Sequence, residues 1–173
     1  MILGLSTSTY TTLHVLISLV GIGSGLVVMY GLLTAQRLDR WTAVFLVTTA
    51  LTSISGFGFP VTHLLPSHIV AILSLLVLAL AIPARYVFHL AGAWRPIYVI
   101  GSTIALYFNV FVLIVQSFEK VPALKALAPT QKEPPFVVVQ LVALLIFAAL
   151  TVFATVRFHS EGAGTGLQKQ KAA

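Results

Sequence analysis

Five stretches of this chain are apolar over about twenty residues each, and short segments rich in charged and turn-forming residues separate them. A helix of that length crosses the hydrocarbon layer of a bilayer, which is about 30 Å thick. The stretches cover residues 10–35, 41–61, 68–85, 96–118 and 136–157. The pattern predicts an all-α fold, a polytopic membrane bundle of five transmembrane helices that takes up residues 1–158.

The composition supports a membrane protein with a single domain. Hydrophobic residues make up 58% of the 173 positions and charged residues 8%, whereas about a quarter of the residues in a soluble domain are charged. The mean hydropathy is +1.03. The sequence contains no cysteine, which excludes thiol catalysis, disulfides and iron–sulfur clusters.

The basic residues predict how the bundle is oriented. Ten Lys and Arg residues against four Asp and Glu residues give a net charge of +6, but they do not gather on one face, so a nucleic-acid partner is not expected. One side of the predicted bundle carries Arg37, Arg40, Arg85, Arg95, Arg157, Lys169 and Lys171, and the other carries Lys120, Lys125 and Lys132. The positive-inside rule then puts the N-terminus outside and the C-terminus inside, with residues 159–173 as a disordered cytoplasmic tail.

The segments between the apolar stretches predict defined turns. Residues 56–68 hold two glycines and two prolines, which indicates an ordered outer turn that presents His63 and His68. Ser67 is expected to cap the helix that follows, as the Ser6–Thr9 run caps the first. The outer loop 119–135 contains a proline followed by good helix formers, which predicts a short interfacial helix over residues 122–128.

Polar side chains inside the apolar stretches point to packing or to function, because each is costly in hydrocarbon. His14 shares a helix face with Gly21 and Gly25, and this small-residue face is expected to pack against another helix. Asn109 lies near the middle of its stretch, so its amide must meet a second polar group inside the bundle. Gln140, on the last stretch, is the expected partner.

The strongest candidate site is a group of polar residues near the outer face: His14, His63, His68, Gln116 and Gln140. Two imidazoles on facing helices suit a haem b iron, so His14 and His68 form the expected axial pair, and the glycines beside His14 leave room for the macrocycle. Three imidazoles suit a Cu, Zn or Fe ion, for which His63 is the third ligand. Gln116 and Gln140 are expected beside the cofactor. The alternative is that the histidines are structural or interfacial.

Other chemistry is poorly supported by the sequence. His89 and His159 lie beside arginines on the inner side and are expected to contact lipid headgroups. The acidic residues are Asp39, Glu119, Glu133 and Glu161, all in predicted loops or in the tail, so no pair of carboxylates can share a substrate. Ion-coupled transport is also disfavoured, because Asn109 is the main polar residue at mid-membrane depth and it does not ionise.

The sequence leaves three functions open. The first is a haem- or metal-binding redox module that exchanges electrons with a quinone. The second is a non-catalytic subunit or assembly partner of a larger membrane complex, and the third is a pore or carrier for a small neutral solute, lined by Ser102, Asn109 and Gln116. No catalytic machinery is evident. The chain resembles small integral membrane proteins of bacteria, which implies a multi-pass protein of the cell (inner) membrane.

Overall fold

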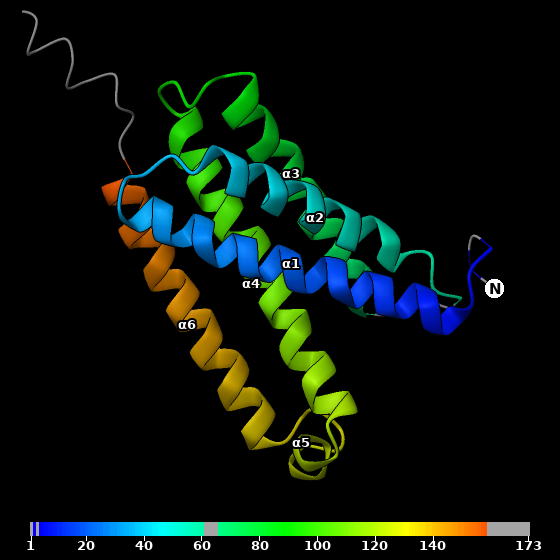
Figure 1. The fold of residues 1–173 in the computed structure, drawn as a ribbon. Coiled ribbons are helices and arrows are strands. Elements are labelled where there is room, and N and C mark those ends of the chain that lie inside the picture. The colour runs from blue at the N-terminus through cyan, green and yellow to red at the C-terminus, as the bar shows by residue number, and fades with distance from the viewer. Residues whose placement is uncertain (1, 3, 61–65, 159–173) are drawn as a thin grey trace, which may run out of the picture.

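The computed structural model describes residues 2, 4–60 and 66–158. This part of the chain folds into six helices, which confirms the all-α prediction (Figure 1). They are α1 (Thr7–Leu33), α2 (Asp39–Gly56), α3 (Pro66–Tyr86), α4 (Trp94–Lys120), α5 (Pro122–Leu127) and α6 (Pro134–Arg157). His63, His159 and the predicted tail 159–173 lie outside the described residues.

Four of these helices are long and apolar enough to cross a membrane: α1, α3, α4 and α6, with mean hydropathies of 2.1, 2.3, 2.1 and 2.8. The predicted count of five membrane-spanning helices is therefore wrong, because α2 does not meet this requirement for length and apolar composition. Its 18 residues span about 27 Å and begin with Asp39 and Arg40. It also carries hydroxyl side chains at Thr42, Thr48, Thr49, Thr52, Ser53 and Ser55.

Local sequence explains where the helices begin. The Ser6 side chain accepts a hydrogen bond from the Thr9 backbone N–H at 3.1 Å, so the predicted cap of α1 is confirmed. The short interfacial helix is also confirmed as α5, with Pro122 at its start. Ser67 is not the cap of α3, because that helix already begins at Pro66, where the missing proline N–H has no cost.

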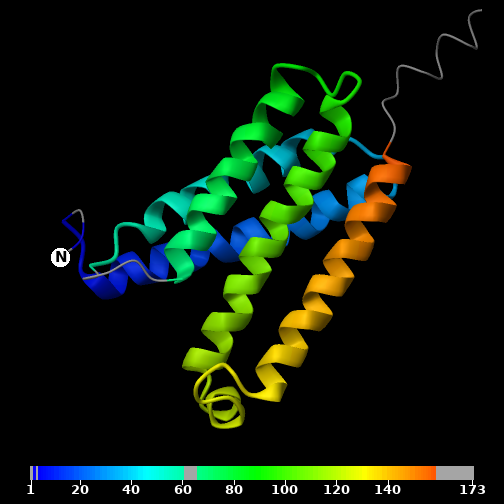
Figure 2. The ribbon, with the colours of Figure 1, turned by 180° about the vertical axis from the view of Figure 1, so that it is seen from behind.

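The helices converge at one end of the molecule and spread at the other. Helix α4 is central and packs against α1, α2, α3, α5 and α6, while α1 and α2 form an antiparallel pair. The C-terminal ends of α1, α3 and α6 lie with the start of α2 and α4, and we call this the basic end (Figures 1 and 2). At the opposite end, the α4–α5–α6 segment diverges from the ends of α1 and α2.

Small residues allow α1 and α4 to approach their neighbours closely. A Cβ atom on Gly25 would lie 2.5 Å from Leu106 Cδ1 and 2.9 Å from the Phe45 ring. A Cβ atom on Gly101 would lie 3.0 Å from that of Ala81. The predicted packing role of the small-residue face of α1 is therefore confirmed, since such contacts replace the hydrophobic drive that lipid cannot supply.

Candidate functional site

His14 is fixed to the C-terminal end of α2. Its Nδ1 atom lies 2.8 Å from the Ser55 hydroxyl, and its ring meets the Phe59 ring edge-to-face at a centroid distance of 5.3 Å. One turn earlier, the Tyr10 hydroxyl donates to the Ser55 carbonyl at 2.7 Å. These contacts tie the first half of α1 to the end of α2.

His68 approaches the same segment from α3. The side chain is buried in the first turn of that helix, and its ring lies 5.3 Å from the Phe57 ring. Residues 55–59 are therefore bordered by His14 on one side and by His68 on another. The structure brings these two predicted ligands to one segment, although they are far apart in sequence.

The predicted metal site has no complete ligand group in residues 2, 4–60 and 66–158. Among them, no three His, Cys, Asp or Glu side chains are grouped so that they could hold a metal ion. The third predicted ligand, His63, lies outside the described part of the chain. The three-histidine site therefore stays a prediction.

The room expected for a haem beside α1 is filled. A Cβ atom on Gly21 would already lie 3.2 Å from the Thr48 hydroxyl and 3.6 Å from the Asn109 amide nitrogen. Gly25 faces Phe45 and Leu106 at still shorter distances. The expectation that these glycines leave space for a macrocycle is wrong, because helices α2 and α4 use that space for their own packing.

The two glutamines lie on different sides of α4. Gln116 borders a cavity of about 50 Å³ that also touches Pro66 and Ser67 at the start of α3, which is too small for a macrocycle. The Gln140 amide instead donates to the Phe111 carbonyl at 3.3 Å. These contacts do not bring Gln116 and Gln140 together beside one cofactor.

Asn109 has a polar partner, as expected, but the partner is Thr49. The Asn109 amide nitrogen donates to the Thr49 hydroxyl at 3.0 Å, and both side chains are buried. Gln140 cannot take this role, because α6 packs on the face of α4 that carries Tyr107, whose ring lies 5.7 Å from that of Phe147. Two residues along a helix correspond to a rotation of about 200°, so Tyr107 and Asn109 face nearly opposite sides.

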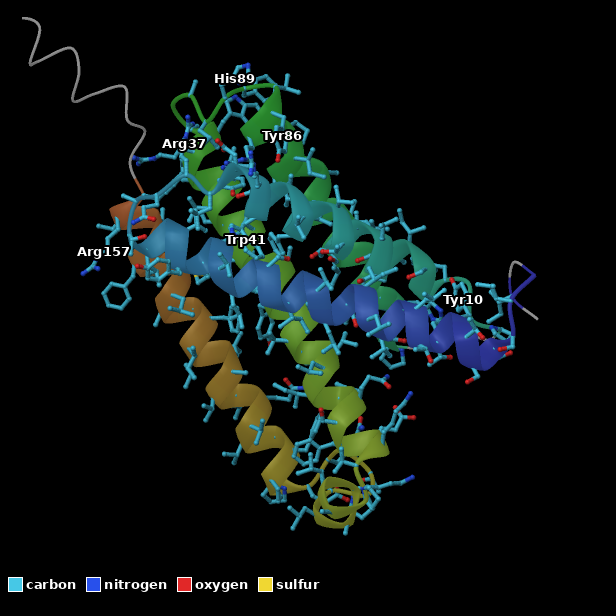
Figure 3. The ribbon with its side chains drawn as sticks, viewed as in Figure 1. Tyr10, Arg37, Trp41, Tyr86, His89 and Arg157 are labelled. Carbon is cyan, nitrogen blue, oxygen red and sulfur yellow. The ribbon has the colours of Figure 1, made fainter. Side chains whose placement is uncertain are left out.

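A second polar site, missed by the sequence analysis as a site, lies at the basic end. Arg37, Asp39, Arg85, Tyr86 and His89 line a cavity of about 180 Å³, which we call the basic cleft. Figure 3 shows Arg37, Tyr86 and His89 close together there, with Arg157 farther away at the end of α6. The α1–α2 turn forms one wall and the end of α3 with its following loop forms the other.

Arg85 is the most buried charged residue of the basic cleft. Its guanidinium donates to the Asp39 carboxylate, and its side chain is only 5% exposed, against 79% for Asp39. The guanidinium also lies 5.0 Å from the centre of the Tyr98 ring, within range of a cation–π contact.

The loop after α3 has a fixed and unusual backbone. His89 and Leu90 adopt φ angles of 48° and 61°, which residues other than glycine rarely adopt. Leu90 is buried and donates its N–H to the Ala84 carbonyl at 3.0 Å, while the Phe88 and Trp94 rings stack 3.8 Å apart. These contacts hold His89 over the basic cleft.

Comparison with known proteins adds no family to this description. A scan against protein-family models and searches of the curated proteins and of the solved structures found no match to the chain. The two candidate sites are therefore the segment bordered by His14 and His68, and the basic cleft. Their chemistry is inferred from their own geometry.

Proposed function

We propose that this small multi-span membrane protein is a non-catalytic subunit or assembly partner of a larger membrane complex. The observation that carries this proposal is that polar side chains of the helices are bonded to neighbouring helices. Asn109 joins α4 to α2, His14 joins α1 to α2, and Gln140 joins α6 to α4.

Such contacts suit a scaffold because they fix how the helices sit against one another. An unpaired amide in hydrocarbon costs several kcal/mol, so a helix that slid or rotated away from its partner would lose stability at once. The same contacts disfavour a pore along α4. Ser102 and Asn109 are buried in helix packing, and Asn109 is bonded across the bundle to Thr49.

Helix α6 offers the proposed surface for a partner. In its most apolar window, 6% of the residues are buried inside the structure, compared with 28% for α3 and 39% for α1 and α4. Its exposed positions include Val138, Leu141, Leu145, Val152, Phe153 and Val156. A surface this wide and apolar is compatible with lipid and with a partner helix, so the two must be separated by experiment.

Site-specific photo-crosslinking in membranes of the source organism separates them. A photoreactive residue at Leu145 or Val152 of α6 is expected to give protein adducts. The matched controls are Leu76 of α3 and Leu26 of α1, which are similarly exposed and are expected to give lipid adducts. Lipid adducts at all four positions, together with a native mass equal to the 18.5 kDa monomer, would contradict the proposal.

A metal ion held by His14 and His68 is the second candidate, favoured by their shared contact with residues 55–59. Elemental analysis and an absorbance spectrum of the purified protein test it. The expected result is about one equivalent of metal that is lost in His14→Ala and in His68→Ala. A colourless, metal-free preparation would leave the scaffold proposal standing alone.

A further inference from the structure

We infer that the basic cleft binds the phosphate group of an anionic membrane lipid. The cleft brings two guanidinium groups and one imidazole together with a single carboxylate, that of Asp39. Its volume of about 180 Å³ is many times the roughly 10–15 Å³ that a single water molecule requires, which is enough for a phosphate group. The charge and the size of the cleft thus match this ligand.

Arg85 supplies the donor geometry that phosphate requires. A guanidinium presents five N–H donors in a planar fork that matches two phosphate oxygens. In the residues that the structure describes, the hydrogen bond seen for this fork goes to one oxygen of Asp39. The guanidinium is oriented against the Tyr98 ring, so it is set before a ligand arrives.

Asp39 occupies the position that a ligand oxygen would take. Its side chain is largely exposed, whereas that of Arg85 is almost fully buried. Water can therefore solvate the Asp39 carboxylate when it leaves the ion pair. The buried Arg85 guanidinium, in contrast, always needs an anion. A phosphate oxygen can take over from Asp39 without leaving Arg85 unpaired.

Both walls of the cleft are built to hold their basic residues in place. On one wall, Ala35 has a φ of 57° and the Gln36 N–H donates to the Gly31 carbonyl at 2.8 Å, which ends α1 in a tight turn just before Arg37. On the other wall, His89 has a left-handed backbone that its packed neighbours maintain. Backbone strain of this kind is concentrated at binding sites, where it fixes a side chain in advance.

The surroundings favour a lipid over free phosphate. The cleft opens where apolar helices end, and the side chains of Tyr86, which lines it, and of Val87 and Phe88, which follow in the chain, are exposed. Aromatic side chains at this level suit the boundary between headgroups and acyl chains. A phosphate in the cleft could therefore keep its acyl chains along the exposed faces of α2 and α3.

Native mass spectrometry of the detergent-solubilised full chain tests this proposal. The probes are short-chain phosphatidylglycerol, phosphatidylcholine and inorganic phosphate. Phosphatidylglycerol is expected to bind best, and Arg37→Ala with His89→Ala to weaken it about tenfold, as expected for the loss of charge-assisted hydrogen bonds. Arg40→Ala is the matched control, because it removes one positive charge from the same end but from outside the cleft.

A second variant separates loss of binding from loss of fold. Asp39→Asn removes the competing carboxylate, so phosphatidylglycerol is expected to bind severalfold more tightly, a gain that misfolding cannot produce. An equal loss in Arg40→Ala would show general surface attraction and overturn the proposal. So would equal binding of phosphatidylcholine, weaker binding to an Asp39→Asn protein whose circular dichroism and unfolding temperature match those of the natural chain, or inorganic phosphate binding as tightly as the lipid.

Discussion

At the scale of single residues, the hydrogen bond between Asn109 and Thr49 can be removed by substituting either partner. Thr49→Val leaves the buried Asn109 amide without its acceptor and is expected to destabilise the bundle by about 1 kcal/mol, since polar contacts between membrane helices are worth about that much. The double variant Thr49→Val with Asn109→Leu removes both polar groups and is expected to recover part of the loss.

The measurement is a double-mutant cycle of unfolding free energies in mixed micelles, with Asn109→Leu as the other single variant. Strictly additive effects would show that the two side chains do not stabilise each other. The cycle also tests the scaffold proposal, because that proposal requires this contact to hold α2 and α4 together.

The need for a partner at Asn109 was predictable from sequence, but the identity of the partner was not. An amide at mid-membrane depth must be paired wherever it points. Whether it meets α2 or α6 depends on the rotation of α4, which Gly25, Gly101 and their neighbours set through tertiary packing. The ion pair between Arg85 and Asp39 was missed for a similar reason, since the two residues are 46 positions apart.

At the scale of helices, two glycines on α1 make a matched pair for testing the packing. Gly25→Ala is expected to cost about 1–3 kcal/mol, because the new methyl group would overlap Leu106 and Phe45. Gly23→Ala meets nothing within 4 Å and is expected to be neutral or to stabilise the helix by up to about 1 kcal/mol. Thermal unfolding in detergent measures both, and similar effects would contradict the close approach at Gly25.

The stability of the turn that leads into α6 is expected to depend on pH. The Glu133 carboxylate accepts hydrogen bonds from the Thr130 N–H at 3.1 Å, the Thr130 hydroxyl at 2.9 Å and the Lys132 N–H at 3.0 Å. Desolvation raises the pKa of Glu133, but these hydrogen bonds together lower it below its ordinary value of 4.5. The turn is thus stabilised at neutral pH, and this stabilisation is lost as the pH falls through the lowered pKa.

Amide hydrogen exchange of residues 128–133, corrected for the intrinsic effect of pH, measures this change. Protection is expected to fall in acid for the natural chain and to vary much less with pH in Glu133→Gln, which cannot ionise. The same acid-dependent loss in both proteins would rule out Glu133 as its cause.

Helix positions were predicted more accurately than helix roles. Apolar runs and prolines located all five long helices to within a few residues, because length and hydrophobicity act locally. The same runs overestimated how apolar α2 is. Its charged start and its hydroxyl side chains lower the hydropathy of the helix only when its true ends, Asp39 and Gly56, are known. The apolar runs also allowed two incompatible expectations for the face of Gly21 and Gly25, helix packing and room for a macrocycle, and the structure supports the packing.

At the scale of the whole molecule, the convergence of helices at the basic end and their spread at the other bear on orientation. If α2 crosses as well, the positive-inside rule puts the N-terminus outside and the basic end in the cytoplasm. The chain has no cysteine, so single introduced cysteines report on sides of the membrane without background. Gln36, Ala91 and Ala126 are exposed positions for this purpose.

The pattern of labelling also decides whether α2 crosses the bilayer. Gln36 and Ala91 precede α2 and α4 at the same end of the molecule. If both α2 and α3 cross, an impermeant maleimide should label Ala126→Cys in intact cells and reach Gln36→Cys and Ala91→Cys only after permeabilisation. If α2 does not cross, only α3 separates Gln36 from Ala91, and the cysteines introduced at these two positions must lie on opposite sides of the membrane. The first pattern would add α2 to the four helices that are long and apolar enough to cross, and the second would leave α1, α3, α4 and α6 as the spans.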